Sequence, residues 1–87
     1  MRNLRTVSEV VQLPALNQRM YIIDWNRLVE EIRRVDKQLI PDMLEKFKGG
    51  SEVKTEFFFD VGSHLGEGGK YGPTFLRITM SSEEEEG

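Results

Sequence analysis

The chain has 87 residues, of which 38% are apolar and 31% are charged, a composition typical of one small folded domain. It contains no cysteine, which excludes disulfide bonds, thiolate nucleophiles and cysteine-based zinc sites. The net charge is −3, but four of the fifteen acids form the run Glu83–Glu86, so residues 1–82 carry twelve basic and eleven acidic side chains.

This charge distribution divides the chain into two parts. We expect residues 1–80 to form a single α+β domain and residues 81–87 to be a flexible acidic tail. No apolar run approaches the roughly 20 residues of a membrane-spanning helix, and the first residues lack the apolar segment of a secretory signal. We therefore expect a protein that does not associate with membranes and lies in the cytoplasm, or in the nucleus or an organelle of a eukaryote.

Two short apolar runs open the domain. Residues 6–13 and residues 19–23 are rich in the side chains that favour strands. Residues 14–19 connect them and begin with a proline. The pattern predicts two strands that form a hairpin.

The next segment carries the clearest periodicity. Apolar residues recur every three or four positions from Trp25 to Phe47, which predicts one long amphipathic helix. We expect Asp24 to cap its start. Pro41 interrupts the stripe, because it has no N–H to donate and disfavours helical geometry in the residue before it. The sequence therefore predicts either a kink at Pro41 or a second short helix with Pro41 in its first turn.

The apolar stripe of this helix is longer than one small sheet can cover. A surplus apolar face of this kind is typical of a surface that binds a partner. We therefore predict a partner or dimer interface formed by Trp25, Leu28, Ile32, Leu39, Met43 and Phe47.

Two runs of alternating side chains follow the helix, at residues 53–61 and 74–80, and predict a second pair of strands. Phe57 and Phe59 fall on the apolar side of the first run, whereas Phe58 interrupts its polar side. The order strand, strand, helix, strand, strand predicts an antiparallel four-stranded sheet with the helix packed on one face.

No residue pattern predicts catalysis, a metal or a cofactor. His64 is the only histidine and has no converging ligands in the sequence, so we interpret it as a solvated loop residue. The loop GEGGKYG lacks the Ser or Thr that follows the lysine of a phosphate-binding loop, and it leads into a strand instead of a helix. We expect a protein that is not an enzyme.

Aromatic and basic residues of the last two strands suggest a binding surface. If the strands pair, Phe58 and Phe75 share a face with Lys54 and Arg77. Single-stranded nucleic acids bind such faces, because bases stack on aromatic rings while cations contact phosphates. The predicted nucleic-acid site therefore comprises Lys54, Phe58, Lys70, Tyr71, Phe75 and Arg77.

Two segments resemble known families. The run FFFDVGS, followed by KYG and FLRIT, resembles the first hairpin of a Pur repeat, and WNRLVEEIRRVD is similar to the helix of the transcriptional positive-cofactor family. With the Whirly proteins, these families share a four-stranded sheet plus a helix, form dimers and bind single-stranded nucleic acid. The resemblance, with the order of elements permuted, implies a core formed by Phe57, Phe59, Leu76 and Ile78, and it implies the same six nucleic-acid-binding residues.

We therefore expect a small homodimeric protein that binds single-stranded DNA or RNA without catalysing a reaction. The alternative is a small acidic protein-binding module, such as an inhibitor, an immunity-type or anti-defence protein or an accessory subunit, that acts through its acidic surface and the Glu83–Glu86 tail. The two hypotheses differ in the sign of charge on the binding face, which is positive for the first and negative for the second.

Overall fold

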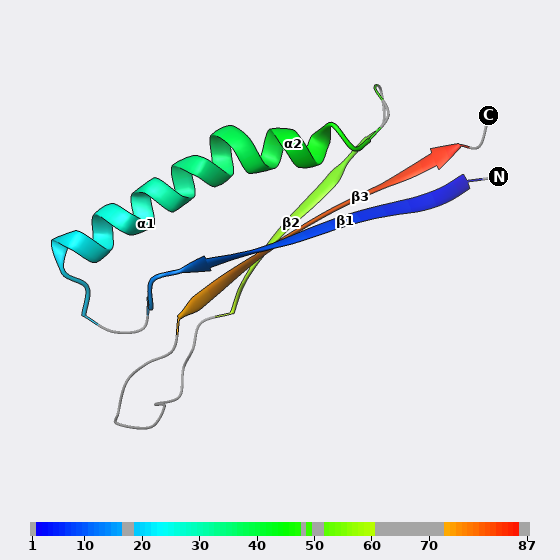
Figure 1. The fold of residues 1–87 in the computed structure, drawn as a ribbon. Helices are drawn as coiled ribbons and strands as arrows, with labels where there is room; N and C mark the ends of the chain where they lie inside the picture. The colour runs from blue at the N-terminus through cyan, green and yellow to red at the C-terminus, as the bar shows by residue number, and fades with distance from the viewer. Residues whose placement is uncertain (1, 17–18, 48, 50–51, 61–72, 86–87) are drawn as a thin grey trace.

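The computed structural model describes residues 2–16, 19–47, 49, 52–60 and 73–85. Its elements follow the order β1 (Arg2–Leu13), α1 (Ile22–Arg34), η1 (Val35–Leu39), α2 (Ile40–Leu44), β2 (Lys54–Asp60) and β3 (Thr74–Glu85). Strand β3 lies in the middle of the sheet and pairs antiparallel with both β1 and β2 (Figure 1). The predicted four-stranded ββαββ arrangement is wrong, since the described residues form a three-stranded sheet and one helix of 23 residues.

The strand predicted at residues 19–23 does not form. Ile22 and Ile23 are instead the first helical residues, and the extended Tyr21 precedes them as the N-cap. The N–H of Trp25 donates to the Tyr21 carbonyl at 3.0 Å, so the N-cap lies three residues before the predicted one. Asp24 lies in the first turn, where the helix dipole favours a negative charge.

The helix passes through Pro41 without breaking. In a regular α-helix, the proline ring would crowd the carbonyl of Lys37 and leave it without a donor. The π-helical turn η1 precedes the proline, and in it the N–H of Ile40 donates to the carbonyl of Val35. Such a turn inserts one residue into the helix, which makes room for the ring. The N–H of Glu45 then donates to the Pro41 carbonyl at 3.1 Å, so regular α-geometry resumes.

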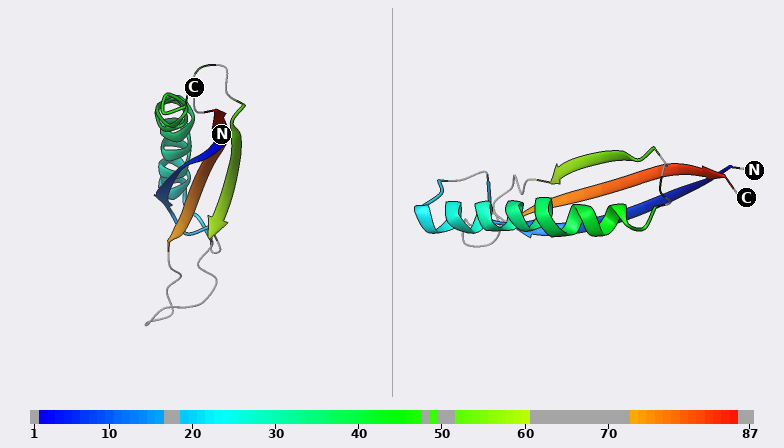
Figure 2. Two further views of the ribbon diagram at one scale, coloured as in Figure 1. Left: turned by 90° about the vertical axis from the view of Figure 1, so that its right-hand side faces the viewer. Right: turned by 90° about the horizontal axis from the view of Figure 1, so that it is seen from above.

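The core lies between the helix and the face of β1 and β3 that it covers. Seen from above, the helix overlies β1, whereas β2 lies to one side (Figure 2). Within the described residues the core consists of Val11, Leu13, Leu28, Val35, Met43, Phe47, Leu76, Ile78 and Met80. At one end of the core, the buried Thr74 hydroxyl accepts a hydrogen bond from the Leu16 N–H at 3.1 Å, which holds the chain leaving β1 against the start of β3.

Strand β2 is the uncovered edge of this fold. Its alternation is as predicted, since Phe57 and Phe59 pair with the buried Ile78 and Leu76 on the helix side of the sheet. Both rings nevertheless stay half exposed, because the helix does not extend over β2. The prediction that Leu76 and Ile78 are core residues is confirmed, and the same prediction for Phe57 and Phe59 is wrong.

Strands β1 and β3 continue beyond the end of β2. Their pairing extends to Arg2 opposite Glu85, whereas the last β3 residue paired with β2 is Ser81. Residues 81–85, which we expected in a tail, are thus hydrogen-bonded to β1. The radius of gyration is 16.5 Å, compared with about 12 Å for a compact domain of this length. In the described part of the chain, no helix is long and apolar enough to span a membrane.

Candidate interaction surfaces

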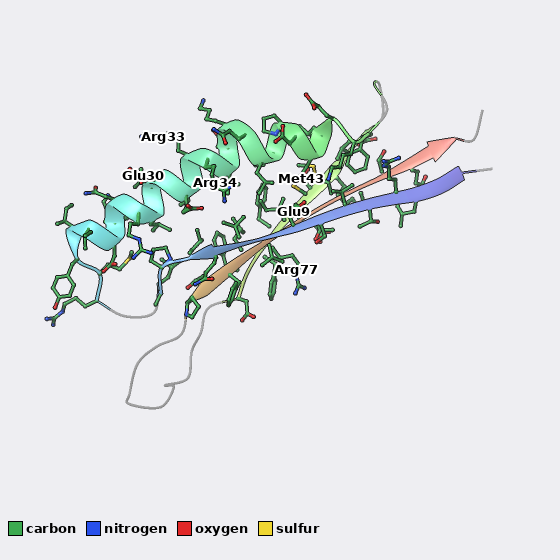
Figure 3. The ribbon with its side chains drawn as sticks, in the orientation of Figure 1. Glu9, Glu30, Arg33, Arg34, Met43 and Arg77 are labelled. Carbon is green, nitrogen blue, oxygen red and sulfur yellow. The ribbon has the colours of Figure 1, made fainter. Side chains whose placement is uncertain are left out.

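The first candidate surface is the sheet face turned away from the helix, which we call the open face. Among the residues whose side chains the structure describes, the alternation along each strand and the pairing register place 14 on it. They are Leu4, Thr6, Ser8, Val10 and Gln12 of β1, Lys54, Glu56, Phe58 and Asp60 of β2, and Phe75, Arg77, Thr79, Ser81 and Glu83 of β3. Figure 3 shows Arg77 projecting from this face, on the side of the sheet opposite to Met43 of the helix.

Four of the six predicted nucleic-acid-binding residues share the open face. Phe58 is directly opposite Arg77 in the register and Phe75 lies on the next row of this face, whereas Lys54 lies two rows away on the other side, beyond the row of Glu56 and Thr79. All four side chains are exposed, as the alternation predicted. Their role in binding nucleic acid stays a prediction. The two remaining residues, at positions 70 and 71, lie outside the described residues, as does position 64, which holds the single histidine.

The open face does not have the positive charge that the nucleic-acid hypothesis requires. Lys54 and Arg77 share it with three carboxylates, which are Glu56, Asp60 and Glu83. Between β1 and β3 on this face, the hydroxyls of Ser8 and Thr79 lie 3.2 Å apart. The described part of this face is therefore of mixed charge.

The second candidate surface is an apolar groove between the helix and β2, which we call the β2 groove. Its volume is about 520 Å³, within the range of small ligand-binding pockets. Its walls are formed mainly by Val29, Ile32 and Ile40 of the helix and by Phe57, Phe59 and Leu76 of the sheet. Charged side chains lie at its rim, among them Arg33 and Lys37. The groove exists because the helix packs over β1 and β3, so the flank of its apolar stripe lies beside β2 without covering it.

The residues predicted as a partner or dimer interface divide between the core and the surface. Leu28, Met43 and Phe47 are buried within the chain, and Leu39 packs against them, so these side chains are not offered to a partner. Trp25 and Ile32 are 54% and 47% exposed. Ile32 belongs to the β2 groove.

Sequence reasoning missed Phe57 and Phe59 as surface residues. The alternating pattern identifies their shared face but not the width of the layer that covers it. A signal for the groove was present in the helix, since Val29, Ile32 and Ile40 widen the apolar stripe on one flank.

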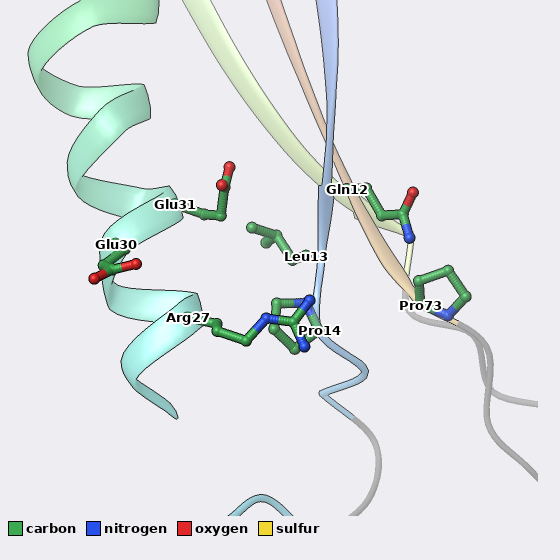
Figure 4. Close-up of a pocket in the computed structure, with 7 residues that line it drawn as sticks. All are labelled: Gln12, Leu13, Pro14, Arg27, Glu30, Glu31 and Pro73. Atoms are coloured by element: carbon green, nitrogen blue, oxygen red, sulfur yellow. The ribbon is translucent and has the colours of Figure 1, made fainter. Parts of the chain in front are cut away.

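A smaller pocket of about 320 Å³ lies between α1 and the end of β1, next to the start of β3 (Figure 4). Arg27, Glu30 and Glu31 contribute charges of both signs to its wall. Arg27 lies 3.9 Å from Asp24, and Glu31 accepts a hydrogen bond from Arg34 at 3.0 Å. Arg27 and Glu31 thus already have partners along the helix.

A metal centre is not apparent in the described residues, because no group of three His, Cys, Asp or Glu side chains converges there. The acidic residues of the helix are interleaved with basic ones, and the pairs between them are solvent-exposed. Exposed pairs of this kind stabilise a helix only slightly.

Comparisons with known proteins do not identify this chain. No protein-family model, no curated protein and no solved structure matches it. The resemblance to the Pur and positive-cofactor families therefore stays a prediction, and the function has to be argued from the two surfaces described above.

Proposed function

We propose that this protein acts by binding another polypeptide through the outer edge of β2 and the adjoining β2 groove. The observation that carries the proposal is the exposure of Phe57 and Phe59, 52% and 50%, on the helix side of an edge strand. Complete burial of an aromatic ring is worth about 1.5–3 kcal/mol. Burial of the exposed halves of these two rings by a partner would therefore stabilise the complex.

The edge of β2 supplies the second element of such a site. An edge strand presents backbone N–H and C=O groups that can pair with a strand of another chain. Because the groove lies directly beside this edge, an added strand forms main-chain hydrogen bonds and buries apolar side chains at the same time. In this mode the hydrogen bonds supply affinity and the groove selects the side chains. This is the protein-binding alternative, with its surface at β2 in place of the acidic tail.

A site-specific photocrosslinker tests this proposal. A benzophenone amino acid replaces Phe59 in the groove, and in a matched control it replaces Val10, which is exposed on the open face of β1. After irradiation in cells that normally make the protein, we expect Phe59 to form a covalent adduct with one polypeptide, identified by mass spectrometry of the linked peptide. Equal adducts from both positions, or none from position 59, would contradict the proposal.

A second candidate function is the binding of single-stranded nucleic acid on the open face. The observation that favours it is the direct pairing of Phe58 with Arg77, with Phe75 and Lys54 on the same exposed face. A base stacked on an aromatic ring is worth roughly 1–3 kcal/mol. The three carboxylates on this face oppose phosphate binding, which is why we rank this function second.

Fluorescence anisotropy with labelled single-stranded and duplex oligonucleotides tests the second candidate. If the open face binds nucleic acid, the single strand binds more tightly than the duplex, and salt weakens binding. The variant Lys54→Ala/Arg77→Ala then has lower affinity and a smaller salt dependence. An absence of binding at low salt, where phosphate contacts are strongest, removes this function.

A further inference from the structure

The two edges of the sheet differ in how completely their helix-facing side chains are covered. On the β1 edge, Val11 and Leu13 are 5% and 2% exposed. On the β2 edge, Phe57 and Phe59 are about half exposed. Within the described residues, β2 is therefore the edge at which the apolar layer is incomplete, and a chain that adds to the sheet gains more there.

The sequence of β2 is complementary to itself when two copies run antiparallel. A twofold axis that passes through Phe57, perpendicular to the sheet, pairs all seven residues of Lys54–Asp60 with the same segment of a second copy. It places each Lys54 directly opposite the partner's Asp60, and opposite charges at such positions stabilise a sheet. By symmetry the pair occurs twice.

Neighbouring registers lack this complementarity. An axis through Phe58 pairs only residues 56–60 and places Glu56 opposite the partner's Asp60. An axis through Glu56 pairs only residues 54–58 and places two glutamates opposite each other. Like charges directly across two strands are destabilising. Registers that differ by a single residue would place Phe57 opposite the partner's Phe58 and so direct the apolar side chains of the two copies to opposite faces.

We propose that two copies of this chain associate through their β2 strands, antiparallel and with the twofold axis at Phe57. This inference rests on the proposed function, because it identifies the bound polypeptide as a second copy. The dimer has a continuous six-stranded sheet in the order β1-β3-β2-β2-β3-β1 with both helices on one side. On that side the two Phe57 rings are neighbours, and the two β2 grooves join into one apolar layer between the helices.

The same arrangement affects the open face. Lys54 pairs with the partner's Asp60 there, which leaves Arg77 as the cation of the described face that has no such pair across the dimer. Dimerisation through β2 thus uses one of the two cations on which nucleic-acid binding by this face depends. Dimerisation through β2 and nucleic-acid binding on the open face therefore compete for Lys54.

A charge-swap experiment tests the dimer and its register together. Lys54 and Asp60 are both exposed, so their substitution leaves the core of each chain unchanged. We expect sedimentation velocity of the full chain to show a reversible dimer. Because two pairs change from attractive to repulsive, Lys54→Asp and Asp60→Lys should each raise the dissociation constant by about tenfold. The double variant, which restores opposite charges, should return to within about threefold of the parent.

Glu56→Lys is the matched control for the register. Glu56 lies opposite the partner's Phe58 in the proposed dimer, so this substitution should change the dissociation constant by less than about threefold. If the axis passed through Phe58 instead, both Glu56→Lys and Asp60→Lys would strengthen the dimer. That result would overturn the proposed register.

Cysteine crosslinking provides a second measurement. The chain contains no cysteine, and Phe57→Cys places one thiol of each copy on the twofold axis, where cross-strand Cα distances suit a disulfide. Mild oxidation should link Phe57→Cys into a covalent dimer and should leave Val10→Cys largely unlinked. Equal linkage of the two variants, or a chain that stays monomeric at its highest soluble concentration, overturns the dimer. If such a monomer still forms the position-59 adduct with a different polypeptide, the proposed function stands and only this inference fails.

Discussion

At the scale of single residues, two neighbours in one row of the sheet illustrate what decides burial. Ile78 and Phe57 are cross-strand partners on the same face, yet Ile78 is fully buried and Phe57 is 52% exposed. The difference arises from the helix, which covers β3 and leaves β2 uncovered. Hydrophobicity alone would not separate them, since both side chains are large and apolar.

This difference predicts unequal costs of truncation. Ile78→Ala should lower the free energy of unfolding by about 2–5 kcal/mol, because it creates a cavity in the core. Phe57→Ala should cost only about 1 kcal/mol in the monomer, because half of the ring is already in water. Urea denaturation of dilute protein measures both values. Equal costs in dilute protein would mean that Phe57 is buried in the single chain.

At the scale of elements, the helix is one unit with a π-helical turn before Pro41. Its real N-terminus is at Tyr21, and Asp42, although it follows a proline, lies in the last turn of the continuous helix, which ends at Leu44. The dipole of a continuous helix favours a negative charge in its first turn and disfavours one in its last turn. The two aspartates therefore have different electrostatic environments.

Substitution of each aspartate measures helix continuity. Asp24→Ala should lower stability by about 0.5–1 kcal/mol at low salt, because it removes a favourable charge from the first turn and the partner of Arg27. Asp42→Ala should leave stability unchanged or raise it by a few tenths of a kcal/mol, because it removes a negative charge from the last turn. Thermal unfolding at low and high salt provides the comparison. Two substitutions of equal cost would indicate a helix that starts anew at Pro41.

Elements with a strong local period could be predicted from the sequence. The prediction was wrong where contacts with the rest of the fold decide between strand and helix. The strand at residues 6–13, the helix from Trp25 and the alternation around Phe57 are all present. Tyr21 to Ile23 have high strand propensity, but no neighbouring strand pairs with them in the described structure, and they join the helix instead.

For the candidate surfaces, the alternation in the sequence predicted on which face of the sheet each strand residue lies. It did not predict which strands the helix covers. The shared open face of Phe58 and Arg77 follows from alternation alone. The exposure of Phe57 depends on where the helix crosses the sheet, and no pattern within β2 encodes that position. For the same reason Leu28 and Met43, predicted for a partner, lie in the core.

At the scale of the whole molecule, the fold is a thin two-layer plate with a projecting ribbon. Its principal extents are 55, 24 and 13 Å, and the longest dimension follows β1 and β3. The part of this ribbon beyond β2 has only two strands, with Arg2 opposite Glu85 and Arg5 opposite Ser82. A two-stranded ribbon without a third strand is marginally stable in water.

Deletion of residues 83–87 should therefore have a local effect. Residues 2–4 of β1 lose their antiparallel partners, so their amide hydrogens should exchange faster, while the exchange of residues 7–13 stays slow because their pairing and the core above them are intact. Hydrogen exchange followed by mass spectrometry measures both segments. Faster exchange across all of β1 would show that the acidic end of β3 stabilises the whole sheet.

The adjacent ends of β1 and β3 have a mechanical consequence. Because Arg2 and Glu85 face each other across antiparallel strands, a force that pulls them apart acts across the ladder and loads one pair of residues at a time. The strands would separate like a zipper, from the terminal pair inward to Leu13 and Thr74. A chain pulled at these two residues would thus begin to open at low force. The first pairs to separate lie in the two-stranded ribbon, away from the core under the helix.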